Sequence, residues 1–259
     1  MEFSFELIAL LFCVAGIAGF VDAMAGGGGL ITLPALLMTG ISPAQALATN
    51  KLQSSFGSFS ASWYFVRSRT VQLKSMRLAM ICTFVGAALG AVSVQYIEPD
   101  ILMSLIPILL IAISMYFLFM TVNNESNLPP RISEAAFAFF VGGGVGFYDG
   151  FLGPGAGSIF AVCFMAIARC SLVTATARTK VLNFTSNIAA LLLFILAGLP
   201  IWELGLIMAL GSFLGGRLGA KTVVYHGQKW IRPLVIIMSM AMALKLLWEQ
   251  HEQWLKLIF

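Results

Sequence analysis

Long apolar stretches separated by short polar segments run through the whole chain. Most approach the ~20 residues that an α-helix needs to cross the hydrocarbon core of a bilayer. In the first half the pattern predicts helices over residues 3–24, 43–66, 78–97 and 101–122, with a short apolar piece over residues 30–38. The second half repeats this order over residues 133–151, 158–168, 172–197, 202–224 and 230–248. We therefore expect an all-α integral membrane protein, built as a polytopic helical bundle.

Composition excludes a soluble enzyme of ordinary type. Hydrophobic residues make up 59% of the 259 residues and charged residues 10%, with a mean hydropathy of +0.94. A soluble domain carries about 25% charged residues. The net charge of +4 comes largely from predicted loops, which is typical of membrane topology rather than nucleic-acid binding. The four cysteines lack a CxxC spacing, and we expect them to be small buried apolar residues.

One motif occurs twice. The segment GFVDAMAGGGG at residues 19–29 returns as GFYDGFLGPGA at residues 146–156, which places Asp22 and Asp149 at equivalent positions. In each copy a carboxylate and a glycine run interrupt an apolar stretch. The backbone groups freed by such a break must face protein or a water-filled cavity, because lipid cannot satisfy them. Paired breaks in two halves are a pointer to a transporter's binding site.

Loop charges indicate how the two copies are oriented. The basic loop at residues 67–77 is followed by acidic Glu98 and Asp100, whereas in the second half Glu203 comes first and a basic region over residues 217–232 follows. Cytoplasmic loops collect Lys and Arg. The pattern therefore predicts inverted repeats, with the short apolar pieces as half-spans or re-entrant arms and both termini outside. We divide the chain into a first transmembrane repeat, a cytoplasmic linker and a second transmembrane repeat, over residues 1–122, 123–132 and 133–259.

Each half also carries a cation inside an apolar helix. Lys51 and Lys180 lie eight residues past the predicted helix starts, and so about 12 Å deep at ~1.5 Å per residue. That depth is close to the midplane of a bilayer core about 30 Å thick. Charged residues there are costly and usually face a transport pathway. The alternative is that they form structural ion pairs with Asp22 and Asp149, and the two interpretations are compatible.

Polar residues continue from each cation along one helical face. Asn50, Ser54 and Ser58 are spaced four residues apart, and so are Thr179, Asn183 and Asn187. Such a stripe can line an aqueous path or hold helices together, and we favour the path. Glycines spaced four apart, at residues 86–90 and 211–219, predict close helix packing instead.

The glycine runs differ from nucleotide-binding loops, because neither has a GxGxxG pattern or a following Gly-Lys-Ser/Thr. The first turn of a helix after a break offers N–H groups and a positive dipole end, which suit an anion. We expect Gly27 and Gly28 to hold backbone shapes closed to residues with a Cβ, or to let a ligand approach the chain closely. The predicted binding residues for a small oxyanion are Gly26, Gly27, Gly28, Gly29, Asn50, Lys51, Ser54, Gly153, Gly155, Gly157, Arg178, Thr179, Lys180, Asn183 and Asn187. Asp22 and Asp149 are predicted to exchange protons or balance charge, with a simple ion pair as the alternative.

The two motifs, together with SPAQALATNK at residues 42–51 and the matching residues 175–180, resemble the sulfite exporter TauE/SafE family. The similarity covers nearly the whole chain and is closest to bacterial inner-membrane members of no assigned substrate. It implies transport of sulfite, sulfonates or related organosulfur anions. Pro154 and Ala156 interrupt the second glycine run, so we expect the two half-sites to differ.

These observations predict a multi-pass transporter of the bacterial inner membrane. We expect it to move a small organosulfur or sulfur oxyanion by alternating access, with export as the direction. An anion channel is the first alternative and a membrane-embedded enzyme the second. No catalytic residue, cofactor or metal is expected. The expected partners are the anionic substrate and the lipid bilayer, without nucleic acid, and a homodimer stays open.

Overall fold

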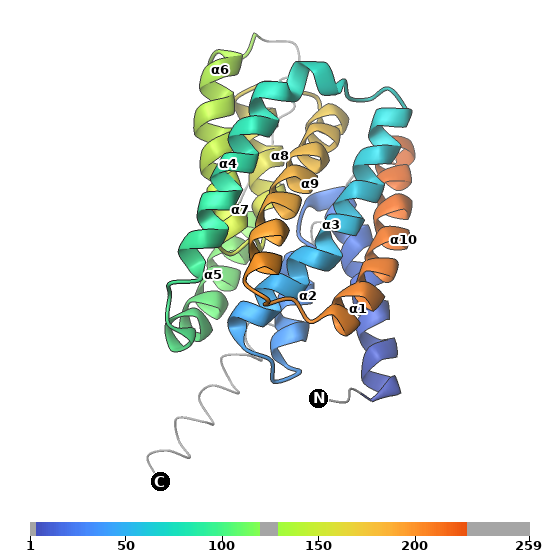
Figure 1. Cartoon of the computed structure of the whole chain (residues 1–259). Helices are drawn as coiled ribbons and strands as arrows, with labels where there is room; N and C mark the ends of the chain where they lie inside the picture. The colour runs from blue at the N-terminus through green and yellow to red at the C-terminus, as the bar shows by residue number, and fades with distance from the viewer. Residues whose placement is uncertain (1–3, 120–128, 227–259) are drawn as a thin grey trace.

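A computed structural model describes residues 4–119 and 129–226 of the chain (Figure 1). Within those ranges the protein is helical and holds no β-strand. The first half contains α1 (Phe5–Ala25), α2 (Gly29–Leu37), α3 (Pro43–Arg67), η1 (Leu73–Met76), α4 (Arg77–Val94) and α5 (Pro99–Phe119). The second contains α6 (Glu134–Ala136), η2 (Phe137–Gly143), α7 (Gly144–Phe151), α8 (Ala156–Ala166), α9 (Leu172–Leu196) and α10 (Trp202–His226). The helix predicted over residues 230–248 lies outside the described residues.

The predicted helices match the observed ones within a few residues, apart from one element. The stretch predicted as a single helix over residues 133–151 contains a π-helical segment, η2, between α6 and α7. The Gly142 carbonyl at its end accepts a hydrogen bond from the Thr83 hydroxyl of α4 at 3.0 Å. Such π-helical turns are rare and hard to predict from a hydropathy pattern, because they keep the same apolar composition.

The two longest central helices begin in the same way. The Ser42 hydroxyl caps α3 by accepting from the Gln45 N–H, and the Gln45 side chain returns to the Ser42 N–H. This capping box is followed by Pro43 in the first turn, where its missing N–H costs nothing. At the start of α9 the Ser171 hydroxyl accepts from the Thr174 N–H. The repeated Ser therefore fixes the start of both helices, and with it the depth of each lysine.

Helices α3 and α9 pack against each other at the centre of the molecule. On one side α10 packs against both α1 and α3, and on the other α4 packs against both α7 and α9. Figure 1 shows that α3 and α9 run in opposite directions, as do α10 and α4. Helices α1, α3 and α4 of the first half thus have α7, α9 and α10 of the second half in equivalent packing positions.

Glycines allow these flanking helices to touch. A Cβ atom on Gly215 of α10 would lie 1.9 Å from the Gly16 carbonyl oxygen of α1. On the other side a Cβ on Gly90 of α4 would lie 2.1 Å from the Phe147 carbonyl oxygen of α7. No side chain fits at such distances, so the prediction of close helix packing at these glycines is confirmed.

Two helical hairpins meet in the interior. The chain turns after α1, and α2 leads back to the end from which α1 starts, while α8 likewise returns to the end where α6 lies (Figure 1). The two turns touch: a Cβ on Gly26 would lie 2.3 Å from the backbone carbon of Gly157. In addition the Ser158 hydroxyl donates to the Ala25 carbonyl. The two interruptions of the apolar pattern therefore lie side by side, although they are far apart in sequence.

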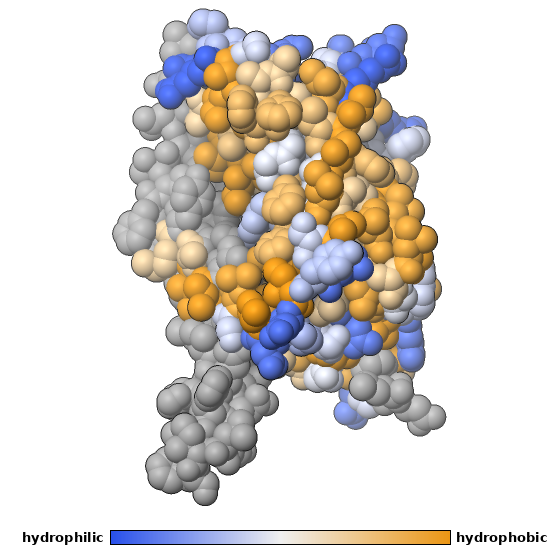
Figure 2. All heavy atoms as spheres, turned by 60° about the vertical axis from the view of Figure 1, so that its left-hand side comes forward, coloured by the Kyte–Doolittle hydropathy of each residue, from blue (hydrophilic) through white to orange (hydrophobic). Residues whose placement is uncertain are grey.

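The outer surface is apolar. Three helical segments among the described residues are long and apolar enough to span a membrane: Phe5–Ala25, Leu73–Val94 and Leu172–Leu196. Figure 2 shows a broad hydrophobic face between hydrophilic residues at the top and bottom. On α10 a row of large side chains is exposed at four-residue spacing: Leu206, Leu210, Leu214 and Leu218. A contiguous apolar face of this kind indicates contact with lipid.

The four cysteines are free, as expected from their spacing. Their predicted burial is wrong: Cys13 is exposed and Cys82, Cys163 and Cys170 are half-buried. A small apolar side chain on a lipid-facing helix gains nothing from burial, because the lipid is itself apolar.

Charged residues gather at the two ends. Figure 1 places the connection between α3 and α4, which carries Arg69 and Lys74, at the same end as the last turns of α10, which carry Lys221. The connections that hold Glu98 and precede Glu203 lie at the opposite end.

Candidate functional site

Two ion pairs, one buried and one partly buried, cross between the halves of the chain. The Nζ atom of Lys51 on α3 lies 2.6 Å from the Oδ1 atom of Asp149 on α7. The Nζ atom of Lys180 on α9 lies 2.9 Å from the Oδ2 atom of Asp22 on α1. Each lysine therefore pairs with the aspartate of the other repeat motif. This arrangement joins the α1–α3–α10 group of helices to the α4–α7–α9 group at two points.

The local fold explains why the carboxylates lie there. Asp22 is in the last turn of α1, and the chain folds back so that the Gly28 N–H donates to its Oδ1 atom at 3.2 Å. Asp149 is in the last turn of α7, and the Ser186 hydroxyl of α9 donates to its Oδ2 atom. Burying a charge is costly unless it is paired and hydrogen-bonded, and both carboxylates meet that requirement.

A hydrogen bond from Tyr148 stabilises the turn that follows Asp149. The Tyr148 hydroxyl donates to the Pro154 carbonyl at 2.6 Å, which ties the end of α7 to the start of α8. Gly153 and Gly155 have positive φ angles of 95° and 78°, which glycine adopts without strain. At the first break the left-handed residue is Gly26, with φ 80°.

Gly28 adopts a right-handed helical conformation, so a special backbone shape is not its role. Glycine is needed there because Asp22 lies too close for a side chain: a Cβ on Gly28 would lie 2.6 Å from the Asp22 Cβ atom. The part of the prediction that invoked an unusual conformation at Gly28 is therefore wrong, and the left-handed shape belongs to Gly26.

A small polar cavity lies between the two turns. Its volume is about 20 Å³, and it is lined by Asp22, Gly26, Gly29, Asn50, Lys51, Ser54, Asp149, Gly153, Gly155, Gly157, Asn183 and Asn187. This volume holds roughly one water molecule. An oxyanion with four heavy atoms is larger, so the cavity must widen to admit one.

All of these lining residues belong to the set predicted from sequence. The other five predicted residues lie elsewhere: Gly27 and Gly28 in the first turn, and Arg178, Thr179 and Lys180 on α9. Gly28 lines a neighbouring cavity of about 10 Å³, together with Ala18, Gly19, Asp22, Gln53, Ser54 and Ser212. Lys180 reaches the site only through Asp22, and the buried Thr179 hydroxyl has no hydrogen-bond partner among the described residues.

Arg178 points away from the cavity. Its Nη1 atom lies 3.4 Å from the Cys170 sulfur, and its guanidinium lies 6.0 Å from the centre of the Phe164 ring. Burial raises the pKa of the Cys170 thiol, and the nearby Arg178 charge opposes that rise. The structure therefore does not bring Arg178 together with the other predicted cations.

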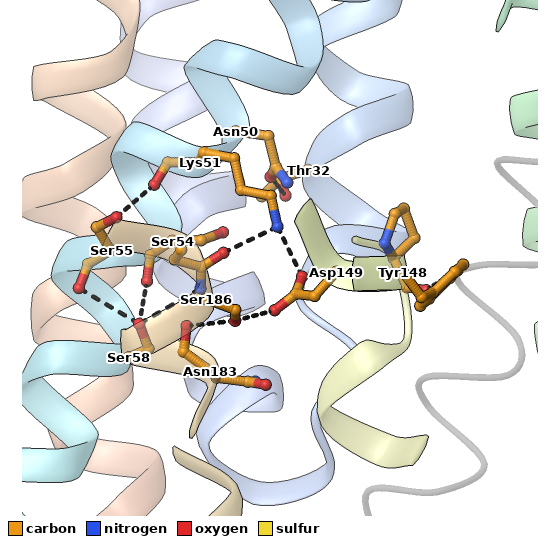
Figure 3. A network of polar contacts seen from close by, with 12 residues as sticks. Thr32, Asn50, Lys51, Ser54, Ser55, Ser58, Tyr148, Asp149, Asn183 and Ser186 are labelled. Carbon is orange, nitrogen blue, oxygen red and sulfur yellow. Dashed lines mark hydrogen bonds and ion pairs between the residues drawn. The ribbon is translucent and has the colours of Figure 1, made fainter. Parts of the chain in front are cut away.

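A hydrogen-bonded network extends along α3. The Asn50 Oδ1 atom accepts from the Thr32 hydroxyl at 2.6 Å and from the Gln53 amide at 2.9 Å, and Lys51 also donates to the Asn187 Oδ1 atom at 3.1 Å. Figure 3 shows Lys51 and Asp149 pointing toward each other, with Ser186 on the far side of the carboxylate.

The sequence-based prediction missed Thr32, Gln53 and Ser212. Gln53 lies three residues after Asn50 on the same helix, and Thr32 lies four residues after Gly28, so helical spacing could have found both. Ser212 reaches the second cavity from α10, and no motif links it to Asp22.

Interrupted helices that meet at a charged, buried site, inside a bundle with an apolar surface, define a membrane transporter. The chain belongs to the sulfite exporter TauE/SafE family, because residues 11–246 match the sequence model of that family. The resemblance inferred from the repeat motifs is thereby confirmed.

Curated relatives agree with this assignment. The chain is 50% identical over 247 residues to the "Probable membrane transporter protein YfcA" of Escherichia coli K12, covering 95% of this chain and 92% of the relative. It is 46% identical over 250 residues to a "Probable membrane transporter protein" of Haemophilus influenzae, covering 96% and 98%. A Sinorhizobium protein, "Probable membrane transporter protein ORF9", is 42% identical over 246 residues, covering 95% and 94%. No solved structure matches the chain.

Proposed function

We propose that this protein is a multi-pass transporter of the bacterial inner membrane that exports a small sulfur-containing anion, such as sulfite or a sulfonate, by alternating access. The observation that carries the proposal is the polar cavity between two touching helix breaks, with a lysine and two carboxylates in its wall. The family name supplies the sulfur chemistry, and the polar cavity is the candidate binding site for a small anion.

An inverted arrangement of two repeats supports alternating access. The central helices α3 and α9 run antiparallel, and the flanking pairs α1–α10 and α7–α4 are packed equivalently. In this interpretation α2 and α8 are re-entrant arms that enter and leave on one side. Transporters with inverted repeats rock one group of helices against the other around a fixed site near the midplane. The end that carries Arg69, Lys74 and Lys221 would then be cytoplasmic.

Anion recognition would come from three kinds of donor. Gly29, the first residue of α2, and Gly157, in the first turn of α8, line the cavity, so the positive dipole ends of both helices face it. The Lys51 ammonium adds a full charge, and the amides of Asn183 and Asn187 add neutral donors. A small oxyanion with three or four acceptor oxygens matches such a set.

We interpret the small cavity as a closed state of the proposed transport cycle. It holds roughly one water molecule, and the two ion pairs hold the flanking helix groups together across it. A channel needs a continuous open path, whereas a transporter needs a site that closes. This closed geometry favours the transporter over the channel.

A thermal-shift panel on the purified protein tests the proposal. Sulfite, thiosulfate, sulfoacetate, taurine, sulfate and phosphate are compared at equal ionic strength. An anion present at 100 times its Kd stabilises the folded state by about 2.7 kcal/mol, which raises the melting temperature. We expect selective stabilisation by sulfur oxyanions, followed by their flux in proteoliposomes. Equal responses to all six compounds would refute the assignment of the substrate class.

A further inference from the structure

The charged groups around the cavity sum to zero. Lys51 and Lys180 carry two positive charges, and Asp22 and Asp149 carry two negative charges, in two pairs that are closed in this state. A monovalent anion that enters such a site brings one uncompensated negative charge into a buried environment. That is unfavourable unless a positive charge enters with it. A group at this neutral site must therefore accept a positive charge when the anion binds.

The two carboxylates differ in how firmly they are held. The Asp149 side chain is 5% exposed, and both of its oxygens accept strong bonds, from Lys51 at 2.6 Å and from the Ser186 hydroxyl. The Asp22 side chain is 23% exposed, and its two bonds are longer, 2.9 Å to Lys180 and 3.2 Å to the Gly28 N–H. Asp22 is thus the more accessible and more weakly bonded acid.

Asp22 also occupies a distinct position between two cavities. It lines the central cavity and the smaller one that reaches Ser212 on α10, and Ser54 lines both as well. Lys51 on α3 and Asp149 on α7 are the other charged residues that line the central cavity, and Lys180 on α9 contacts Asp22 directly. From α10 the Ser212 side chain lines the smaller cavity, and the Ser158 hydroxyl of α8 bonds the Ala25 carbonyl instead. Asp149 lines only the central cavity of these two.

We propose that Asp22 takes up a proton when the anion binds, so that one proton and one monovalent anion cross together. The proton binds a carboxylate oxygen of Asp22 and breaks its ion pair with Lys180. The Lys180 ammonium keeps its charge, the site gains a net charge of one, and the anion in the central cavity neutralises it. The Lys51–Asp149 pair stays closed. This proposal rests on the proposed function, since it assigns the coupling ion of that same site.

The coupling has a consequence for direction. A proton and a monovalent anion that move together carry no net charge, so the membrane potential does not drive them. The direction then follows the product of the anion and proton gradients. Where the outside is more acidic, the pH difference drives the pair inward. Export then requires an inside-to-outside ratio of the anion that exceeds the outside-to-inside ratio of protons.

Proteoliposomes of the full-length wild-type protein provide the first measurement. They are loaded with the pH dye pyranine, clamped with potassium and valinomycin, and exposed to sulfite at a pH at which the hydrogensulfite monoanion predominates. The substrate's own protonation is controlled with protein-free liposomes. We expect an acid shift inside that accompanies anion entry, and accumulation of about tenfold per unit of inward pH gradient for a monovalent anion. Anion flux without proton movement would overturn the coupling and leave the proposed function standing.

A variant locates the proton. In Asp22→Asn the amide fixes a neutral group at this position, so the accumulation driven by a pH gradient should disappear. The matched control is Glu203→Gln, which removes an exposed carboxylate at the start of α10 and should keep the full response. Proton-driven accumulation that persists in Asp22→Asn would overturn the assignment to Asp22. If wild-type vesicles move none of the six compounds of the thermal-shift panel, the proposed function fails instead, and the two failures are thus distinguished.

Discussion

Lys51 and Asp149 are 98 positions apart in the chain, yet their Nζ and Oδ1 atoms lie 2.6 Å apart in the centre of the molecule. The lysine belongs to the first repeat motif and the aspartate to the second, and the Lys180–Asp22 pair repeats this exchange. The two halves are therefore joined by the charged residues that they share. A change in either half acts on the other through these contacts.

Removing one partner of the Lys51–Asp149 pair should lower the stability of the protein much more than removing both. Lys51→Met leaves a buried carboxylate unpaired, and breaking a buried pair in this way costs about 3–5 kcal/mol. The double variant Lys51→Met/Asp149→Asn removes both charges and should recover most of that loss. Thermal unfolding in detergent measures the four members of the cycle.

The control for this cycle is Lys74→Met. Lys74 is an exposed lysine in η1, and its loss should leave the melting temperature unchanged. A double variant as unstable as the single one would show that the two side chains act separately and that the observed ion pair contributes little.

Helix positions and the central site were accessible from the sequence because each rests on a local rule. Apolar length located the helices, and the starts predicted at residues 43 and 172 agree with those of α3 and α9, so the depths of Lys51 and Lys180 followed. The repeat motif then placed both aspartates near the two glycine breaks.

Which lysine pairs with which aspartate was not accessible. The choice depends on how α1 and α7 fold back beside α9 and α3, and no sequence spacing encodes that contact. Arg178 was misplaced for a similar reason: one step along α9 from Thr179 turns its side chain toward Cys170 instead of the cavity.

Gly26 should be intolerant of any side chain. Its φ angle is 80°, and a Cβ atom would lie 2.3 Å from the backbone of Gly157, so Gly26→Ala both strains the turn and separates the two hairpins. Left-handed strain alone costs about 1–2 kcal/mol, and the clash adds to it. We expect a lower melting temperature and loss of anion-dependent stabilisation.

Gly144→Ala is the matched control, because no atom lies within 4 Å of a Cβ at that position and its φ angle is ordinary. Alanine there should be neutral, or more stable by up to about 1 kcal/mol. A Gly26→Ala protein that melts and binds like Gly144→Ala would mean that the two turns do not touch as described.

Asn183 should affect anion affinity more than stability. Its side chain lines the central cavity, its Oδ1 atom has no hydrogen-bond partner among the described residues, and so its loss breaks no internal bond to that oxygen. Asn183→Ala removes one donor to the anion, which corresponds to about 1 kcal/mol and a several-fold weaker Kd. Thr185→Ala on the same helix serves as the control, because the Thr185 hydroxyl bonds the Val181 carbonyl outside the cavity lining. Equal affinities in the two variants would remove Asn183 from the site.

The orientation of the two halves can be tested by chemical labelling. In a background without Cys13, Cys82, Cys163 and Cys170, single cysteines replace Arg69, Tyr225 and Glu203, which are all exposed near helix ends. An impermeant maleimide added to cells with a permeabilised outer membrane should label Glu203→Cys and spare Arg69→Cys and Tyr225→Cys, because basic ends stay in the cytoplasm. Lysis should then make all three reactive. Protection of Arg69→Cys together with labelling of Tyr225→Cys would place the end of α3 and the end of α10 on opposite faces, and the inverted-repeat arrangement would have to be abandoned.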